Sequence, residues 1–167
     1  QVVSSTPGPD SLPVGTIWSA FCLERNEDVY ENIVYDTVGN TNAVKGGMEW
    51  VSGYGSARVL AGPGGDPLDT MTAWIHMNWE TEGFDGYEAQ NAIWYIEAEL
   101  DTLGTVKAQQ IFDAAYDAVY GATQWKNHSV RVLNLSLNGE HIQDHTYSVV
   151  PAPGAIVLTG LGTCMIG

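Results

Sequence analysis

The middle of the chain contains three successive stretches with apolar residues at helical spacing, and this pattern restricts the fold more than any other feature. Gly121, at the end of the third stretch, favours a helix stop. We therefore expect about three helices between Leu68 and Ala122. Their predicted buried faces are Met71, Trp74, Ile75 and Asn78; Ala89, Ala92, Ile93, Ile96 and Leu100; and Ile111, Ala115, Ala118 and Val119.

Segments rich in β-branched and aromatic residues lie on both sides of the helical region and favour strands. Asn138-Gly139 is a typical two-residue hairpin turn, so the segments flanking it predict two paired strands. Strands before and after a block of helices indicate an α+β fold, with helices packed on an antiparallel sheet or sandwich. The expected strands are residues 14–24, 29–38, 128–137 and 141–151, with a short one at 58–60 inside the glycine-rich loop 39–67.

The chain of 167 residues, 44% of them hydrophobic, is long enough for one globular domain, which we place at residues 14–150. Residues 1–13 contain three of the seven prolines and predict an extended arm. Residues 151–167 predict a proline-rich exit followed by an apolar strand. No stretch reaches the roughly 20 apolar residues that a membrane span requires, so no membrane contact is expected in the mature form.

The charge is strongly acidic, with 20 Asp and Glu against 6 Lys and Arg and a net charge of -14. Such a surface repels phosphate backbones and anionic lipids, which excludes nucleic-acid and peripheral membrane binding. Many glycines and aromatic residues, with few lysines, are typical of a secreted, β-rich protein. The start Gln1-Val2-Val3 lacks an initiator Met and fits a chain from which a signal peptide has been removed.

The sequence lacks the short motifs of common catalytic and phosphate-binding sites. His141 and His145 flank Asp144 and, four residues apart on a strand, are expected to share a face. A metal site there would need a third ligand. We therefore predict no metal, no cofactor and no catalytic residue, and a protein that is not an enzyme; paired carboxylates for glycoside hydrolysis stay open.

Two short segments resemble the paired signatures of bacterial thioester domains: Phe21-Cys22-Leu23-Glu24, and Ala89-Gln90-Asn91-Ala92-Ile93-Trp94 near a helix start. The resemblance implies that the Cys22 thiolate attacks the Gln90 carboxamide, ammonia leaves, and a thioester forms that a surface amine can open. Backbone N–H groups at the helix start would stabilise the oxyanion. Two alternatives stay open: Cys22 as a small buried hydrophobic residue of a strand with Gln90 as an exposed helical residue, and a disulfide between Cys22 and Cys164.

The C-terminal residues Val150-Pro151-Ala152-Pro153, followed by an apolar run, resemble a PEP-CTERM sorting signal. Ala152 replaces the usual Glu, and the basic cluster of such signals does not follow. The resemblance implies a bacterial protein that is secreted to the cell surface or the extracellular matrix, such as a biofilm matrix. An ordinary last core strand is the alternative.

The uncharged tail would be an aggregation hazard in water, and it suits donation of a strand to the sheet edge of another subunit. Head-to-tail contacts of that kind propagate into filaments. The leading prediction is thus a structural filament subunit whose partners are copies of itself, with the arm 1–13 as a reciprocal contact. The alternatives are a thioester adhesin for amine-bearing surfaces and an extracellular carbohydrate-binding module. The predicted assembly residues are Ala155, Ile156, Val157, Leu158, Leu161 and Ile166.

Overall fold

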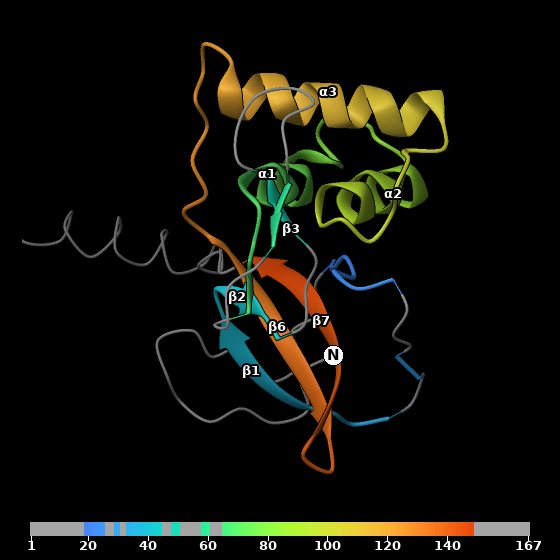
Figure 1. Ribbon diagram of the computed structural model, residues 1–167, viewed down its shortest axis with the longest axis vertical. Helices are drawn as coiled ribbons and strands as arrows, with labels where there is room; N and C mark the ends of the chain where they lie inside the picture. The colour runs from blue at the N-terminus through green and yellow to red at the C-terminus, as the bar shows by residue number, and fades with distance from the viewer. Residues whose placement is uncertain are drawn as a thin grey trace, which may run out of the picture.

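The computed structural model describes residues 19–25, 29–30, 33–44, 48–50, 58–60 and 65–148, and it confirms the α+β fold. Three helices gather at one end of the molecule, and an antiparallel sheet extends away from them (Figure 1). None of the described helices is long and apolar enough to cross a membrane. The predicted arm 1–13 and the predicted exit and strand 151–167 lie outside the described residues.

The three expected helices are α1 (Thr70–Asn78), α2 (Gly86–Ile96) and α3 (Val106–Tyr120). Each begins after a side chain that accepts hydrogen bonds from the first free N–H groups, which otherwise have no partner inside a helix. These caps are Asp69, Asp85 and Thr105. The third helix ends before Gly121, as the sequence predicts.

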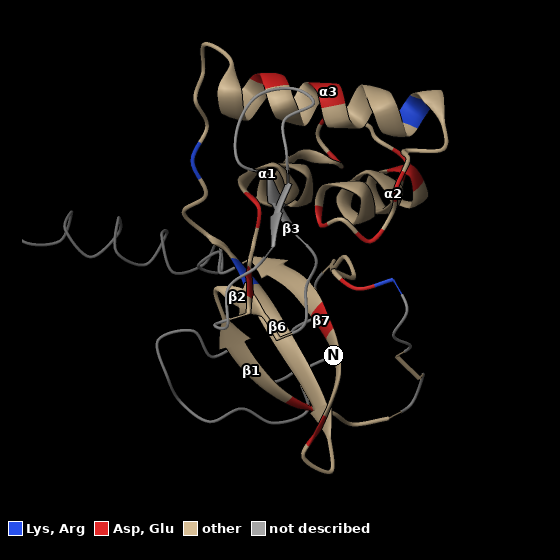
Figure 2. Ribbon diagram, in the orientation of Figure 1, with Lys and Arg blue, Asp and Glu red and all other residues tan. Residues whose placement is uncertain are grey.

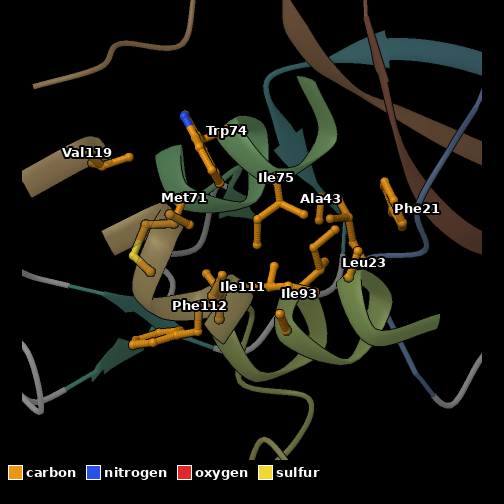
Figure 3. Packing of buried hydrophobic residues seen from close by; sticks show 14 of the residues in the cluster. Phe21, Leu23, Ala43, Met71, Trp74, Ile75, Ile93, Ile111, Phe112 and Val119 are labelled. Carbon is orange, nitrogen blue, oxygen red and sulfur yellow. The ribbon is translucent and has the colours of Figure 1, made fainter. Parts of the chain in front are cut away.

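The main hydrophobic core lies where the helices meet each other and the sheet (Figure 3). Helix α3 packs on both α1 and α2, and α1 contacts the sheet. Phe21 and Leu23, from the segment before the first strand, are buried in the same core. The predicted helix faces account for most of the remaining core, which includes Met71, Trp74, Ile75, Ala89, Ala92, Ile93, Ile96, Ile111, Phe112, Ala115, Val119 and Val132.

The main sheet contains β1 (Asp36–Asn40), β6 (Val130–Leu137) and β7 (Glu140–Ser148) in the order β1-β6-β7. The predicted hairpin is confirmed: Asn138 and Gly139 both have positive φ, 55° and 83°, which suits the turn that joins twisted strands. One face of β6 places Val132 against the helices. The other face places Leu133 and Leu135 in a second cluster with Tyr147 and Tyr35.

Several strand predictions need correction. The described part of the first predicted strand, residues 19–24, makes a single β-bridge and no strand. The second predicted strand, 29–38, is observed as β1, which begins at Asp36. Residues 36–40 form this strand because they pair with one edge of β6. The apolar side chain of Val34, upstream of that pairing, stays 66% exposed.

The predicted loop 39–67 contains short strands that form two small antiparallel pairs. The expected strand at 58–60 is confirmed as β4. The pairs are β2 (Asn42–Ala43) with β5 (Asp66–Pro67), and β3 (Met48–Trp50) with β4 (Arg58–Leu60).

Candidate functional site

The segment that carries Cys22 runs antiparallel to β7 and meets it at one residue pair, Cys22 opposite His145. Two backbone hydrogen bonds of 2.9 Å flank the pair, from Leu23 N–H to the Asp144 carbonyl and from Thr146 N–H to the Phe21 carbonyl. Cys22 and His145 therefore form the kind of antiparallel pair that exchanges no backbone bonds, in which the two side chains stand close together on one face.

The backbone N–H and C=O of Cys22 point away from β7, and both bond to the side chain of Gln90 on α2. The Cys22 N–H donates to Gln90 Oε1 at 2.9 Å, and Gln90 Nε2 donates to the Cys22 carbonyl at 2.7 Å. In Figure 1 the segment lies between the upper end of β7 and α2. The structure thus brings together the two residues that the thioester resemblance singled out, although they are 68 residues apart in the sequence.

The position of Gln90 within its helix differs from the prediction. Asp85 caps α2 by accepting hydrogen bonds from Tyr87 and Glu88 N–H, so the helix begins at Gly86 and Gln90 falls in its second turn. The free N–H groups of the helix start are therefore not the donors to the Gln90 carbonyl. That donor is the Cys22 backbone N–H.

The Cys22 thiol has no disulfide partner among the described residues and is half-buried, and its Sγ lies 3.4 Å from His145 Nε2. Phe21 and Leu23 enter the core under the helices, so the side chain of Cys22 between them points to the opposite face. Burial raises the pKa of the thiol, and the negative charge of Glu24 raises it further; a hydrogen bond with Gln143 opposes both effects. Cys164, the partner of Cys22 in the alternative disulfide, lies outside the described residues.

Gln143 joins His145 to the Cys22 segment. Its Oε1 lies 3.1 Å from His145 Nε2, while its Nε2 donates to the Glu24 carbonyl at 2.9 Å. Burial lowers the pKa of His145, and the nearby Asp144 charge only partly offsets this. No role at the site was predicted for Gln143 from the sequence, although residues 143 and 145 share a face on any regular strand.

The expectation that His141 and His145 share a face is wrong. A β-bulge shifts the register: Leu135 pairs with Gln143, whereas Ser136 pairs with His141. His141 therefore lies beside Asp144, with its Nε2 2.9 Å from Asp144 Oδ1, and His145 lies on the other face beside Cys22.

The carboxylate of Glu24 lies beside His141 and Asp144. The candidate ligand atoms of these three residues lie within 4.8 Å of one another, a spacing that suits a cation. The Asp144 carboxylate already accepts hydrogen bonds from Asn134 Nδ2 and from the Val44 N–H, and Glu24 Oε2 accepts one from the Asp144 N–H at 2.7 Å. These bonds join β7 to β6, to the residue after β2 and to the Cys22 segment.

The remaining predicted site residues lie elsewhere. The predicted assembly residues, Ala155, Ile156, Val157, Leu158, Leu161 and Ile166, lie outside the described residues. Trp74 is buried in the core, as its helical spacing predicts, and Trp79 packs against the same core.

Comparisons with protein-family models, curated proteins and solved structures found no match. The resemblances to thioester domains and to PEP-CTERM signals therefore stay predictions that rest on short motifs. Any function must be argued from the site itself.

Proposed function

We propose that this domain forms an internal thioester between Cys22 and Gln90 and uses it to attach covalently to primary amines on a surface. The observation that supports the proposal is the pair of reciprocal hydrogen bonds between the Cys22 backbone and the Gln90 carboxamide. An ordinary helical glutamine and a buried cysteine would not need this arrangement. The carboxamide is held by both of its polar atoms beside the residue whose sulfur would attack it.

Formation of the thioester joins Cys22 Sγ to Gln90 Cδ and breaks the Cδ–Nε2 bond. The thiol proton leaves with the amide nitrogen, so one ammonia is lost. Attack pushes an electron pair onto Gln90 Oε1, which already accepts a hydrogen bond from the Cys22 N–H. A donor fixed in advance at the atom that gains charge stabilises the transition state without reorganisation.

Opening of the thioester by an amine forms a new Cδ–N bond and releases the Cys22 sulfur; the proton lost by the amine ends on that sulfur. Cys22, Gln90 and His145 are all half-buried, so each keeps some surface in contact with solvent. Asp and Glu residues occur along the helices and the hairpin, with few Lys and Arg residues among them (Figure 2). The net charge of -14 attracts cationic amines such as lysine side chains.

Labelling with methylamine tests this function. The protein should take up one methylamine, and peptide mapping should place it at Gln90. Cys22→Ser and Gln90→Glu should abolish the label, whereas Gln110→Glu, the same change at an exposed position on α3, should retain it. Equal labelling of the Cys22→Ser protein, or a label on another glutamine, would refute the proposal.

The filament function predicted from the sequence depends on residues 155–166, which lie outside the described part of the chain. It stays a prediction. A thioester domain and a polymerising tail are compatible in one chain, because they use different residues.

A further inference from the structure

We propose that His145 is a hydrogen-bond donor to the Cys22 sulfur, held in that role by Gln143, and that it stabilises the thiolate released when an amine opens the thioester. The inference rests on the proposed function and adds a third catalytic residue to it. It begins from the short distance of 3.4 Å between Cys22 Sγ and His145 Nε2.

The backbone makes this contact a fixed one. Cys22 and His145 face each other in an antiparallel bridge, so their side chains leave the backbone side by side. The flanking hydrogen bonds at residues 21, 23, 144 and 146 hold both backbones in place. The imidazole therefore needs no conformational change to reach the sulfur.

The hydrogen-bond partners of Gln143 decide which nitrogen of His145 carries the proton. Gln143 Nε2 donates to the Glu24 carbonyl, an atom that can only accept. This orientation turns Gln143 Oε1 toward His145 Nε2 at 3.1 Å. An acceptor oxygen at that distance favours the tautomer with a proton on Nε2, and the same N–H lies within reach of Cys22 Sγ.

The charge state of the imidazole agrees with this role. Burial lowers the pKa of His145, so the ring is neutral at neutral pH and has one N–H to donate. The charged groups near the pair are Glu24, which acts on Cys22, and Asp144, which acts on His145. Both are acidic and oppose the formation of a thiolate, so a neutral donor at the sulfur offsets part of their effect.

The His145 donor acts when an amine opens the thioester. When an amine attacks Gln90 Cδ, the Cδ–Sγ bond breaks and its electron pair moves to the sulfur. A hydrogen bond from His145 Nε2 is stronger to this thiolate than to the neutral thioester sulfur, so it lowers the barrier. The proton released by the amine passes to the sulfur through water, and His145 is unchanged at the end.

Three variants in a Cys164→Ser background test the inference. His145→Leu removes the donor and keeps a similar volume, whereas His145→Gln places an amide N–H near the position of Nε2. His128→Leu, the same change at an exposed histidine, is the matched control. Two quantities are measured for each: the rate of thioester opening by methylamine, and the pH dependence of alkylation of the free Cys22 thiol by iodoacetamide.

His145→Leu should slow opening about ten- to a hundredfold, which corresponds to the loss of one hydrogen bond to a charged group. It should also shift the alkylation profile to higher pH, while His145→Gln and His128→Leu stay within a few-fold of the parent. Unchanged rates and profile in His145→Leu would overturn the inference. So would an equal loss in His145→Gln, because that result would indicate a base or nucleophile and not a donor.

The two proposals fail in different ways. If the parent protein forms no thioester, the proposed function is wrong, but the alkylation profile still reports whether His145 donates to the Cys22 sulfur. If the parent forms the thioester and the His145→Leu profile does not move, the function stands and the role of His145 is wrong.

Discussion

Cys22 and Gln90 exchange two hydrogen bonds, from the Cys22 N–H to Gln90 Oε1 at 2.9 Å and from Gln90 Nε2 to the Cys22 carbonyl at 2.7 Å. The side chain of a helical residue thus takes the place that a neighbouring strand would occupy along the Cys22 backbone. The arrangement joins the segment around Cys22 to α2.

The cap of α2 should influence the site, because it sets where the helix begins and hence where Gln90 lies. Asp85 accepts hydrogen bonds from Tyr87 N–H at 3.0 Å and Glu88 N–H at 3.2 Å. Asp85→Ala should lower the free energy of unfolding by about 1 kcal/mol and slow methylamine uptake. Asp85→Asn, which keeps the cap, should change neither; chemical denaturation and labelling rates measure both. An uptake rate unaffected by loss of the cap would show that Gln90 is positioned without it.

Glu97, at the end of α2, should destabilise the fold at neutral pH. Burial, together with the nearby Asp69 charge, raises the pKa of Glu97 well above its usual value of 4.5. The folded state therefore holds a proton that the unfolded state releases, and stability falls as pH rises above 4.5. Glu97→Gln should raise the free energy of unfolding at neutral pH by about 1–3 kcal/mol.

The gain from Glu97→Gln should shrink as pH falls from neutral toward 4.5 and should be lost below 4.5, where the glutamate is protonated in both states. Glu82→Gln, an exposed change after α1, is the matched control and should have little effect. A variant that is less stable than the parent at neutral pH would contradict this account of Glu97.

His76 should have the opposite pH dependence. It lies on α1, where its Nδ1 is 2.8 Å from the hydroxyl of Thr146 and its ring meets Phe21 edge-on. Burial lowers its pKa from 6.5 to about 4, so below pH 6.5 the unfolded state binds a proton that the folded state does not bind. Stability should therefore fall as pH drops from 6.5 to 4, by about 3 kcal/mol.

His76→Asn keeps a polar atom near the position of Nδ1 and removes the titration. Thermal unfolding between pH 4 and 6.5 should show a shallower loss of stability in this variant than in the parent. Parallel curves for the two proteins would show that His76 does not contribute to the acid sensitivity.

Much of the fold follows from local patterns in the sequence. The three helices are confirmed because apolar periodicity and caps such as Asp85 and Thr105 act within a few residues. The hairpin at Asn138-Gly139 is confirmed because two adjacent residues fix its turn. The first strands were misplaced because their pairing depends on β6, which lies far later in the chain.

The candidate site was predictable only in part. The Cys22–Gln90 contact came from a resemblance between short motifs, because nothing local to either residue indicates the other. The partnership of Cys22 with His145 could not be predicted, since it depends on the bulge between residues 135 and 136 that sends His141 and His145 to opposite faces. A bulge of one residue has no strong sequence signal here.

The predicted tail contact can be tested by truncation. Removal of residues 154–167 should give a soluble, folded monomer, because the charge-free run that is expected to join another subunit is lost. Electron microscopy and light scattering of the full chain and the truncated chain measure the difference. Assembly of the truncated chain into the same filament would contradict the strand-exchange prediction.

The intact mass of the native protein, measured without any reagent, tests the central claim most directly. The thioester account predicts that the native protein lacks one ammonia that the Cys22→Ser variant keeps, each compared with the mass calculated from its sequence, and that Cys22 and Gln90 are recovered in one cross-linked peptide. This comparison cancels the ammonia that Gln1 would lose on cyclisation in both proteins. A native protein at the full calculated mass, or one lower by only the two hydrogens of a disulfide, would contradict the account.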